Sequence, residues 1–217
     1  RFLIAHGPEV IVLACNSASA AALYWLREQY PKTLFVGMEP AVKPAASRSR
    51  RGRIGVIATA ATFRGAPYAG VLARHAQGCE VIAQVCPKFV PLVESGDLSS
   101  KRARQIVAEQ LAPLFTADID ELVLGCTHYS FLTPLIAEVM GPAVEIIYPS
   151  EAVARQAVRM LEERHRNAEL AEDAAEHLFF TTDSRSNLQQ TLTELLSIRA
   201  TVENIQWVKQ RGIACQT

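Results

Sequence analysis

Short apolar runs alternate with helix-like segments along almost the whole of this 217-residue chain. A short continuous apolar run is typical of a strand that is buried on both faces of a sheet. Strands separated by helical segments form βαβ units, in which right-handed crossovers join parallel strands. The sequence therefore predicts an α/β fold of parallel sheets. Predicted strands cover 9–14, 34–36, 53–58, 80–85, 121–124, 144–147, 178–181 and 205–208, and predicted helices cover 17–29, 62–75, 100–115 (with a break near Pro113), 150–166 and 187–197.

Two of these units contain similar short sequence motifs. Residues 12–19 and 123–130 share Val, Leu, Cys and Ser at equivalent places, and each stretch puts a cysteine directly after an apolar run. If the two units face each other, the thiols of Cys15 and Cys126 face each other across one cleft. Such a pair suits chemistry on both faces of a single carbon atom.

Ligands of parallel α/β sheets bind at the carboxyl ends of the strands. Cys15 and Cys126 occupy such positions, as do Glu39, Thr59 and Thr62. A helix that starts after a cysteine lowers the thiol pKa, and its free N–H groups can hold a carboxylate. The polar side chains next to the two cysteines are Asn16, Ser17, Thr127 and His128, and His128 is close enough in sequence to exchange a proton with Cys126.

Other interpretations apply to the remaining cysteines and histidines. A single cysteine at a strand end is most often a small buried residue, and this interpretation is kept for Cys79, Cys86 and Cys215. Cys126 and His128 could form half of a zinc site, but no second Cys/His pair has suitable spacing. His6, His75, His165 and His177 are expected at the surface, whereas Trp25 and Trp207 are expected to pack inside.

Composition limits the classes of function. The 22 basic and 22 acidic residues balance, which argues against broad nucleic-acid binding. The cluster Arg48, Arg50, Arg51 and Arg53 is interpreted as a solvated connection before a strand, with a phosphate-binding patch as the alternative.

Five cysteines at irregular spacing, without a Cys-x-x-Cys motif, favour a reducing cytoplasmic setting over a disulfide framework. No apolar stretch approaches the length of a membrane span, and no signal peptide is visible. The chain starts at Arg1 rather than Met, so residues before it are expected.

Several motifs resemble those of glutamate racemases. Residues 14–20 resemble the Ala-Cys-Asn-Thr-Ala-Ser-Ala motif of that family, and residues 125–129 resemble its second cysteine motif. Glu39-Pro40, the Thr59/Thr62 turn with Tyr68, and residues 86–94 follow the family's order. The resemblance spans about residues 9–160, and the 86–94 stretch favours glutamate racemases over the related aspartate and hydantoin racemases.

The resemblance implies cofactor-independent, metal-free racemisation of glutamate by two bases, which supplies D-glutamate for peptidoglycan. It implies that Cys126, assisted by His128, acts on L-glutamate and that Cys15 acts on D-glutamate. Glu94 would lie near the second thiol in a supporting position. The substrate's amino and carboxylate groups would be held by Asn16, Ser17, Thr59, Thr62 and Thr127. The family has two similar doubly wound domains facing each other across a cleft, here expected over 1–42 plus 149–217 and over 43–148.

The chain departs from the family pattern at several places. Ser17 replaces a Thr and keeps the hydroxyl, Ser130 replaces a Pro, Gly65 stands where a Ser is common, and Tyr148-Pro149-Ser150 replaces an Asp-Ser stretch. The family's first strand, its Asp-Ser-Gly turn and its Pro-Tyr-Gly loop do not precede Arg1, so the fragment alone is expected to be inactive. Two alternatives stay open, a non-catalytic glutamate-binding or regulatory relative and a racemase of another acidic amino acid. The sequence does not fix the oligomeric state, and a homodimer is one option.

Overall fold

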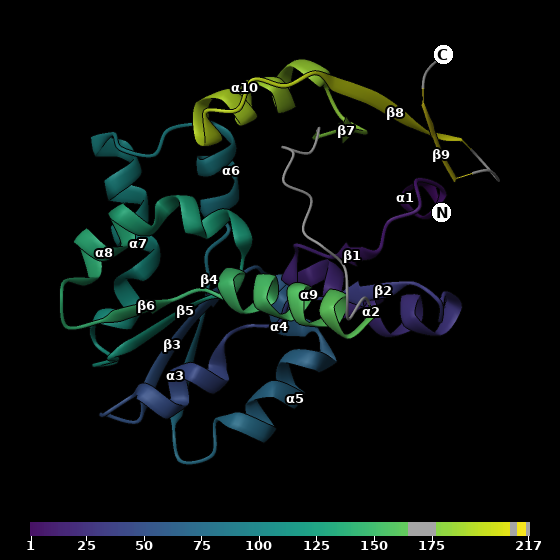
Figure 1. Ribbon diagram of the computed structural model, residues 1–217. Helices are drawn as coiled ribbons and strands as arrows, with labels where there is room; N and C mark the ends of the chain where they lie inside the picture. The colour runs from purple at the N-terminus through teal and green to yellow at the C-terminus, as the bar shows by residue number, and fades with distance from the viewer. Residues whose placement is uncertain (165–176, 209–211, 216–217) are drawn as a thin grey trace.

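The computed structural model describes residues 1–164, 177–208 and 212–215 and confirms the predicted α/β class (Figure 1). Part of the helix predicted over 150–166, together with His165, lies outside the described residues. The strands are β1 (Val10–Val12), β2 (Leu34–Val36), β3 (Arg53–Ala58), β4 (Glu80–Val85), β5 (Glu121–Leu124), β6 (Glu145–Ile147), β7 (Phe179–Thr181), β8 (Val202–Val208) and β9 (Gly212–Cys215). The helices are α1 (Phe2–Ala5), α2 (Asn16–Gln29), α3 (Val42–Arg48), α4 (Ala60–Arg64), α5 (Ala66–His75), α6 (Phe89–Glu94), α7 (Lys101–Phe115), α8 (Thr133–Met140), α9 (Ser150–Arg164) and α10 (Arg185–Leu196), with a 3-10 helix, η1, over Thr127–Leu132.

The largest sheet contains four parallel strands in the order β4-β3-β5-β6. Helices α3 and α5 cover one face, and α6, α7 and α8 cover the other (Figure 1). Because both faces are covered, every residue of β5 is buried, including the charged Glu121 at its start. Leu111, Leu114 and Leu122 are completely buried in the same cluster, and burial of each such side chain contributes about 1.5–3 kcal/mol to folding.

The strand order of this sheet reverses between β3 and β5. The chain leaves β3 through α4 and α5 to reach β4 on one side, and leaves β5 through η1 and α8 to reach β6 on the other. Such a reversal opens a crevice at the carboxyl ends of the two central strands, where ligands of α/β folds bind. Thr59 follows β3 and Cys126 follows β5, so both lie at this crevice.

A second, smaller sheet pairs β1 with β2 in parallel, with Val12 opposite Val36. Helices α2 and α9 pack against it (Figure 1). The alanine-rich sequence of α2 favours a helix, and α2 ends at Gln29, two residues before Pro31. The carboxyl end of β1 therefore leads directly into Cys15 and the start of α2.

The C-terminal strands form a third, mixed sheet that the sequence only partly predicts. β7 pairs with β8 in parallel, and β8 pairs with β9 in an antiparallel arrangement. β9 was not predicted, because its four residues lack a clear periodic signal.

Three further expectations are wrong in detail. The segment 62–75 is divided between α4 and α5 at Gly65, because Pro67 favours a new helix start there. The break expected near Pro113 is absent, because this proline lies in the last turn of α7. Trp25 and Trp207 do not pack inside and are 56% and 73% exposed. The ring of Trp25 contacts only Tyr30 among the described aromatic side chains, at 6.5 Å between ring centroids.

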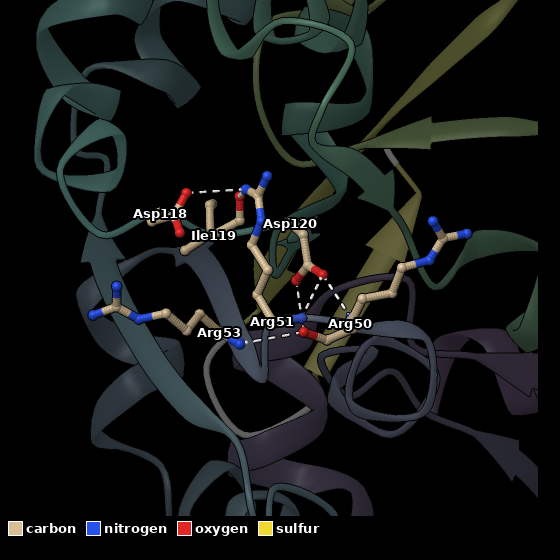
Figure 2. A network of polar contacts seen from close by, with 7 residues as sticks. Arg50, Arg51, Arg53, Asp118, Ile119 and Asp120 are labelled. Carbon is tan, nitrogen blue, oxygen red and sulfur yellow. Dashed lines mark hydrogen bonds and ion pairs between the residues drawn. The ribbon is translucent and has the colours of Figure 1, made fainter.

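The arginine-rich segment is a structural connection, as its simpler interpretation predicts (Figure 2). Asp120 accepts hydrogen bonds from the Arg50 and Arg51 backbone N–H groups at 2.6 and 3.0 Å. Although burial opposes it, these bonds and one from the Ser49 hydroxyl lower the Asp120 pKa. The guanidinium groups pair with carboxylates in Arg48–Glu145, Arg51–Asp118 and Arg53–Glu80. These pairs favour the connection over a phosphate-binding patch.

None of the helices in the described part of the chain is long and apolar enough to cross a bilayer.

Candidate functional site

Cys126 is positioned by a close approach between β3 and β5. The N–H group of Gly125 donates to the carbonyl oxygen of Ile57 at 2.7 Å. A Cβ atom at Gly125 would lie 2.9 Å from the Ala58 Cβ, so only glycine fits without displacement. Cys126 follows with extended backbone and caps η1.

The environment of the half-buried Cys126 differs from the sequence expectation in one respect. Burial raises the pKa of its thiol, the backbone N–H groups of His128 and Tyr129 lower it, and the nearby Cys15 thiol raises it again. The net direction is upward, because loss of solvent outweighs the helix start. The influence of Cys15 on this pKa indicates that the two thiols are near enough to interact. That they face each other across one cleft stays a prediction.

Cys15 is exposed and caps the N-terminus of α2. Its sulfur accepts a hydrogen bond from the Ala18 N–H group at 3.5 Å. The next residue, Asn16, is only 3% exposed, and its amide nitrogen and oxygen have no partner among the described residues. A buried amide without partners is costly, and this one offers both a donor and an acceptor beside the first thiol.

Three hydroxyl groups join the first thiol segment to the turn after β3. Ser17 lies 3.0 Å from Thr59 and 2.9 Å from Thr62, measured between side-chain oxygens. Thr59 and Thr62 lie 3.2 Å apart in the same way. This cluster brings together three residues that the sequence assigned to substrate binding.

Thr127 provides a second link between the two thiol segments. Its hydroxyl donates to the carbonyl oxygen of Ala14 at 3.3 Å. Since Ala14 precedes Cys15 and Thr127 follows Cys126, this bond connects the residues next to the two thiols.

His128 pairs with a residue from the 86–94 stretch. Its Nε2 atom lies 3.3 Å from the Glu94 Oε1 atom, and the two side chains are 39% and 65% exposed. Glu94 therefore contacts His128, and its supporting role for the second thiol stays a prediction.

His128 and Glu94 also border a pocket of about 440 Å³ that the sequence did not predict. Its other wall comes from α10 and the turn before it, including Asp183, Asn187 and Glu194. No local signal links α10 to His128, because the two are far apart in the sequence and carry no shared motif.

The remaining candidate residues lie away from the two thiols or are buried in the hydrophobic core. Glu39 pairs with Arg74 at 3.8 Å and borders a pocket of about 230 Å³ beside α2. Cys86 is fully buried, and burial raises its pKa to about 12, which fits a structural thiol. Cys79 is half-buried, and the side chain of Cys215 lies outside the described part. His6 and His177 are exposed as expected, and His75 is half-buried.

No group of three or more His, Cys, Asp or Glu side chains that could hold a metal ion occurs among residues 1–164, 177–208 and 212–215. Cys126 and His128 thus lack further described ligands for the zinc alternative.

Comparisons with known proteins agree with this geometry. The Asp/Glu/Hydantoin racemase family matches residues 1–157. A glutamate racemase of Pseudomonas putida is 44% identical over 95% of this chain and 77% of its own length. Matched regions cover between 60% and 77% of the length of such curated relatives.

Solved structures show the same fold. Glutamate racemase isoform RacE1 from Bacillus anthracis superimposes with a TM-score of 0.83 and 30% identity, covering 94% of this chain and 76% of that one. Escherichia coli glutamate racemase, solved with L-glutamate and the activator UDP-MurNAc-ala, gives a TM-score of 0.78 and 27% identity, covering 91% of this chain and 74% of that one. Over 91–94% of its length the chain is similar in fold to these two glutamate racemases, and it belongs to the Asp/Glu/Hydantoin racemase family.

Proposed function

We propose that the protein containing this chain interconverts L- and D-glutamate, with Cys15 and Cys126 as the two acid–base groups. The observation that supports the proposal is the hydrogen bond from Thr127 to Ala14, which joins the residues next to the two strand-end thiols, together with the influence of Cys15 on the Cys126 pKa. The glutamate racemase relatives and the L-glutamate in the Escherichia coli structure support the choice of substrate.

Racemisation requires removal of the α-proton on one face of the substrate and delivery of a proton on the other. In the L-to-D direction the Cys126 thiolate removes the proton and the Cys15 thiol delivers one, and the roles reverse in the other direction. Because the pKa of Cys126 is raised, its resting form is the protonated thiol, which is the proton donor of the D-to-L direction. His128, held by Glu94, assists proton transfer at Cys126.

The substrate's amino and carboxylate groups have suitable partners on both sides of the thiols. The unsatisfied amide of Asn16 offers one donor and one acceptor. Ser17, Thr59 and Thr62 offer hydroxyl groups, and Thr127 adds another beside Cys126. The N-terminus of α2 favours a negatively charged group. This chemistry needs no cofactor.

The division into domains belongs to the same proposal. Residues 43–148 contain all of the four-stranded sheet. Residues 1–42 contain β1 and β2, against which α9 from the 149–217 segment packs. A cytoplasmic enzyme of this kind supplies D-glutamate for peptidoglycan, and a homodimer is its proposed assembly.

Serine variants of the two thiols test the proposal in the whole natural protein. Cys15→Ser and Cys126→Ser should each lower the racemisation rate by about 10²–10⁴-fold, the usual contribution of one general acid or base. Circular dichroism of the glutamate solution follows the rate. Cys79→Ser is the matched control, because Cys79 is a half-buried thiol that packs against the hydrophobic core of the four-stranded sheet. Glutamate binding without racemisation by the unmodified protein would favour the non-catalytic relative, and racemisation only of another acidic amino acid would favour the second alternative.

A further inference from the structure

Tyr129 joins the second thiol segment to the segment that carries Glu94. Its side chain is completely buried, and its hydroxyl donates to the carbonyl oxygen of Cys86 at 3.0 Å. Its ring meets Phe89 edge to face, with 5.0 Å between the ring centroids. Burial raises the pKa of the Tyr129 hydroxyl, so this group stays protonated and remains a donor.

The two contacts of Tyr129 lie at the beginning of the segment that ends at Glu94. Cys86 directly follows β4, and Phe89 is the first residue of α6. Glu94 is the last residue of α6, and its carboxylate lies 3.3 Å from His128. Tyr129 directly follows His128 in η1. Its contacts with Cys86 and Phe89 therefore anchor η1 to the start of α6.

The backbone of Tyr129 acts directly on the second thiol segment. Its N–H group bonds to the Cys126 carbonyl oxygen at 3.1 Å. Cys126 occupies the N-cap position of η1, and its side chain accepts no capping hydrogen bond. The nearby N–H groups of His128 and Tyr129 lower the pKa of its thiol, against the larger influence of burial. A six-residue 3-10 helix has few bonds of its own, so these N–H groups depend on side-chain anchors for their direction.

We propose that Tyr129 is a positioning residue for the second thiol: its hydroxyl on Cys86 and its ring on Phe89 hold η1 in place directly after Cys126 and hold His128 against Glu94. This inference rests on the proposed acid–base role of Cys126. It assigns a function to a side chain that does not touch the reacting atoms.

Tyr68 provides a matched comparison. It is also buried and packs edge to face on a phenylalanine, Phe63, at 4.9 Å between ring centroids. Its hydroxyl has no hydrogen-bond partner in the described part of the chain. Tyr68→Phe and Tyr129→Phe therefore remove the same atom from similar surroundings, and only Tyr129→Phe breaks an anchor.

The test measures the pKa of each thiol in the whole natural protein. Iodoacetamide alkylation is followed against pH, and peptide mass spectrometry reports Cys15 and Cys126 separately. Tyr129→Phe should raise the pKa of Cys126 by about 0.5–1 unit, because η1 and its N–H groups, which lower this pKa, would move away from the thiol. The Cys15 pKa should not move in this variant, and neither pKa should move in Tyr68→Phe. The bell-shaped profile of kcat/KM should shift toward higher pH in both directions of the reaction, because the equilibrium constant between enantiomers is one.

A second variant distinguishes the loss of an anchoring contact from a general folding defect. Phe89→Leu keeps the Tyr129 hydroxyl bond and removes the edge-to-face contact, so it should shift the Cys126 pKa upward by less than Tyr129→Phe does. An unchanged Cys126 pKa in both variants would overturn the inference. Because alkylation does not depend on racemisation, this result is separate from that of Cys126→Ser, which tests the proposed function.

Discussion

At the scale of single residues, the most specific predictions concern His128 and Glu121. His128 is presented to the second thiol by η1 and oriented by Glu94. Glu121 lies at the opposite edge of the sheet, is 4% exposed, and has one carboxylate oxygen without a partner among the described residues. The first residue serves proton transfer, and the second links stability to pH.

His128→Asn should slow racemisation by about 10²-fold, because the imidazole no longer assists proton transfer at Cys126. With glutamate deuterated at the α-carbon, the isotope effect on the L-to-D rate should grow as that step becomes slower. Glu94→Gln should produce a smaller decrease of the same kind, since it keeps the imidazole and weakens its orientation. Unchanged rates in His128→Asn would mean that the Cys-x-His pair is structural.

Glu121 should make the folded protein less stable as pH rises. Burial and the neighbouring carboxylates of Glu145 and Asp120 raise its pKa from 4.5 to about 7, against a lowering influence of Arg48. A raised carboxyl pKa favours the folded state when the group is protonated, so this contribution is lost as pH rises from about 4.5 to about 7. Glu121→Gln should increase the unfolding free energy above that pH range by about 1–3 kcal/mol.

Urea unfolding across the pH range measures the effect of Glu121→Gln on stability. Glu80→Gln, at the start of β4, is the control and should retain the wild-type slope.

At the scale of elements, the junction of β3 and β5 sets the position of the second thiol. The strands in 53–58, 80–85 and 121–124 have the bounds that the sequence predicts, because each contains a mostly apolar run between polar segments. Two other strands are predicted less well. β1 has three residues rather than the predicted six, and β9 was missed. Exposed Trp25 shows that an apolar side chain alone does not identify the buried face of a helix.

Gly125→Ala tests that junction. The added Cβ would lie 2.9 Å from the Ala58 Cβ and 3.0 Å from the Ile57 oxygen, and neither group can move without shifting a central strand. The expected cost is about 1–3 kcal/mol of stability, with a loss of activity as Cys126 is displaced. Gly70→Ala in α5 is the control, because its near contact is the flexible end of Arg74 and alanine favours a helix. Thermal unfolding and racemisation are measured for both, and equal behaviour of the two variants would contradict this role of Gly125.

At the scale of the whole molecule, parallel topology accounts for much of the candidate site. The carboxyl ends of β1, β3 and β5 carry Cys15, Thr59 and Cys126, and that placement followed from the sequence. The contacts that complete the site could not be predicted from the sequence. The Glu94–His128 pair, the Tyr129–Cys86 bond and the α10 wall join segments far apart in the chain, and periodicity carries no information on such pairs.

The central claim, two thiols acting on opposite faces of one carbon, is tested most directly by racemisation of unlabelled L-glutamate in D₂O by the whole natural protein. The delivering thiol exchanges with solvent, whereas the proton just removed stays on the other thiol. At early times the D-glutamate formed should therefore carry deuterium at the α-carbon, while the remaining L-glutamate should keep its hydrogen, as read by proton NMR and chiral separation. Early D-glutamate that retains the substrate's own hydrogen would show that one group serves both faces and would contradict the two-thiol account.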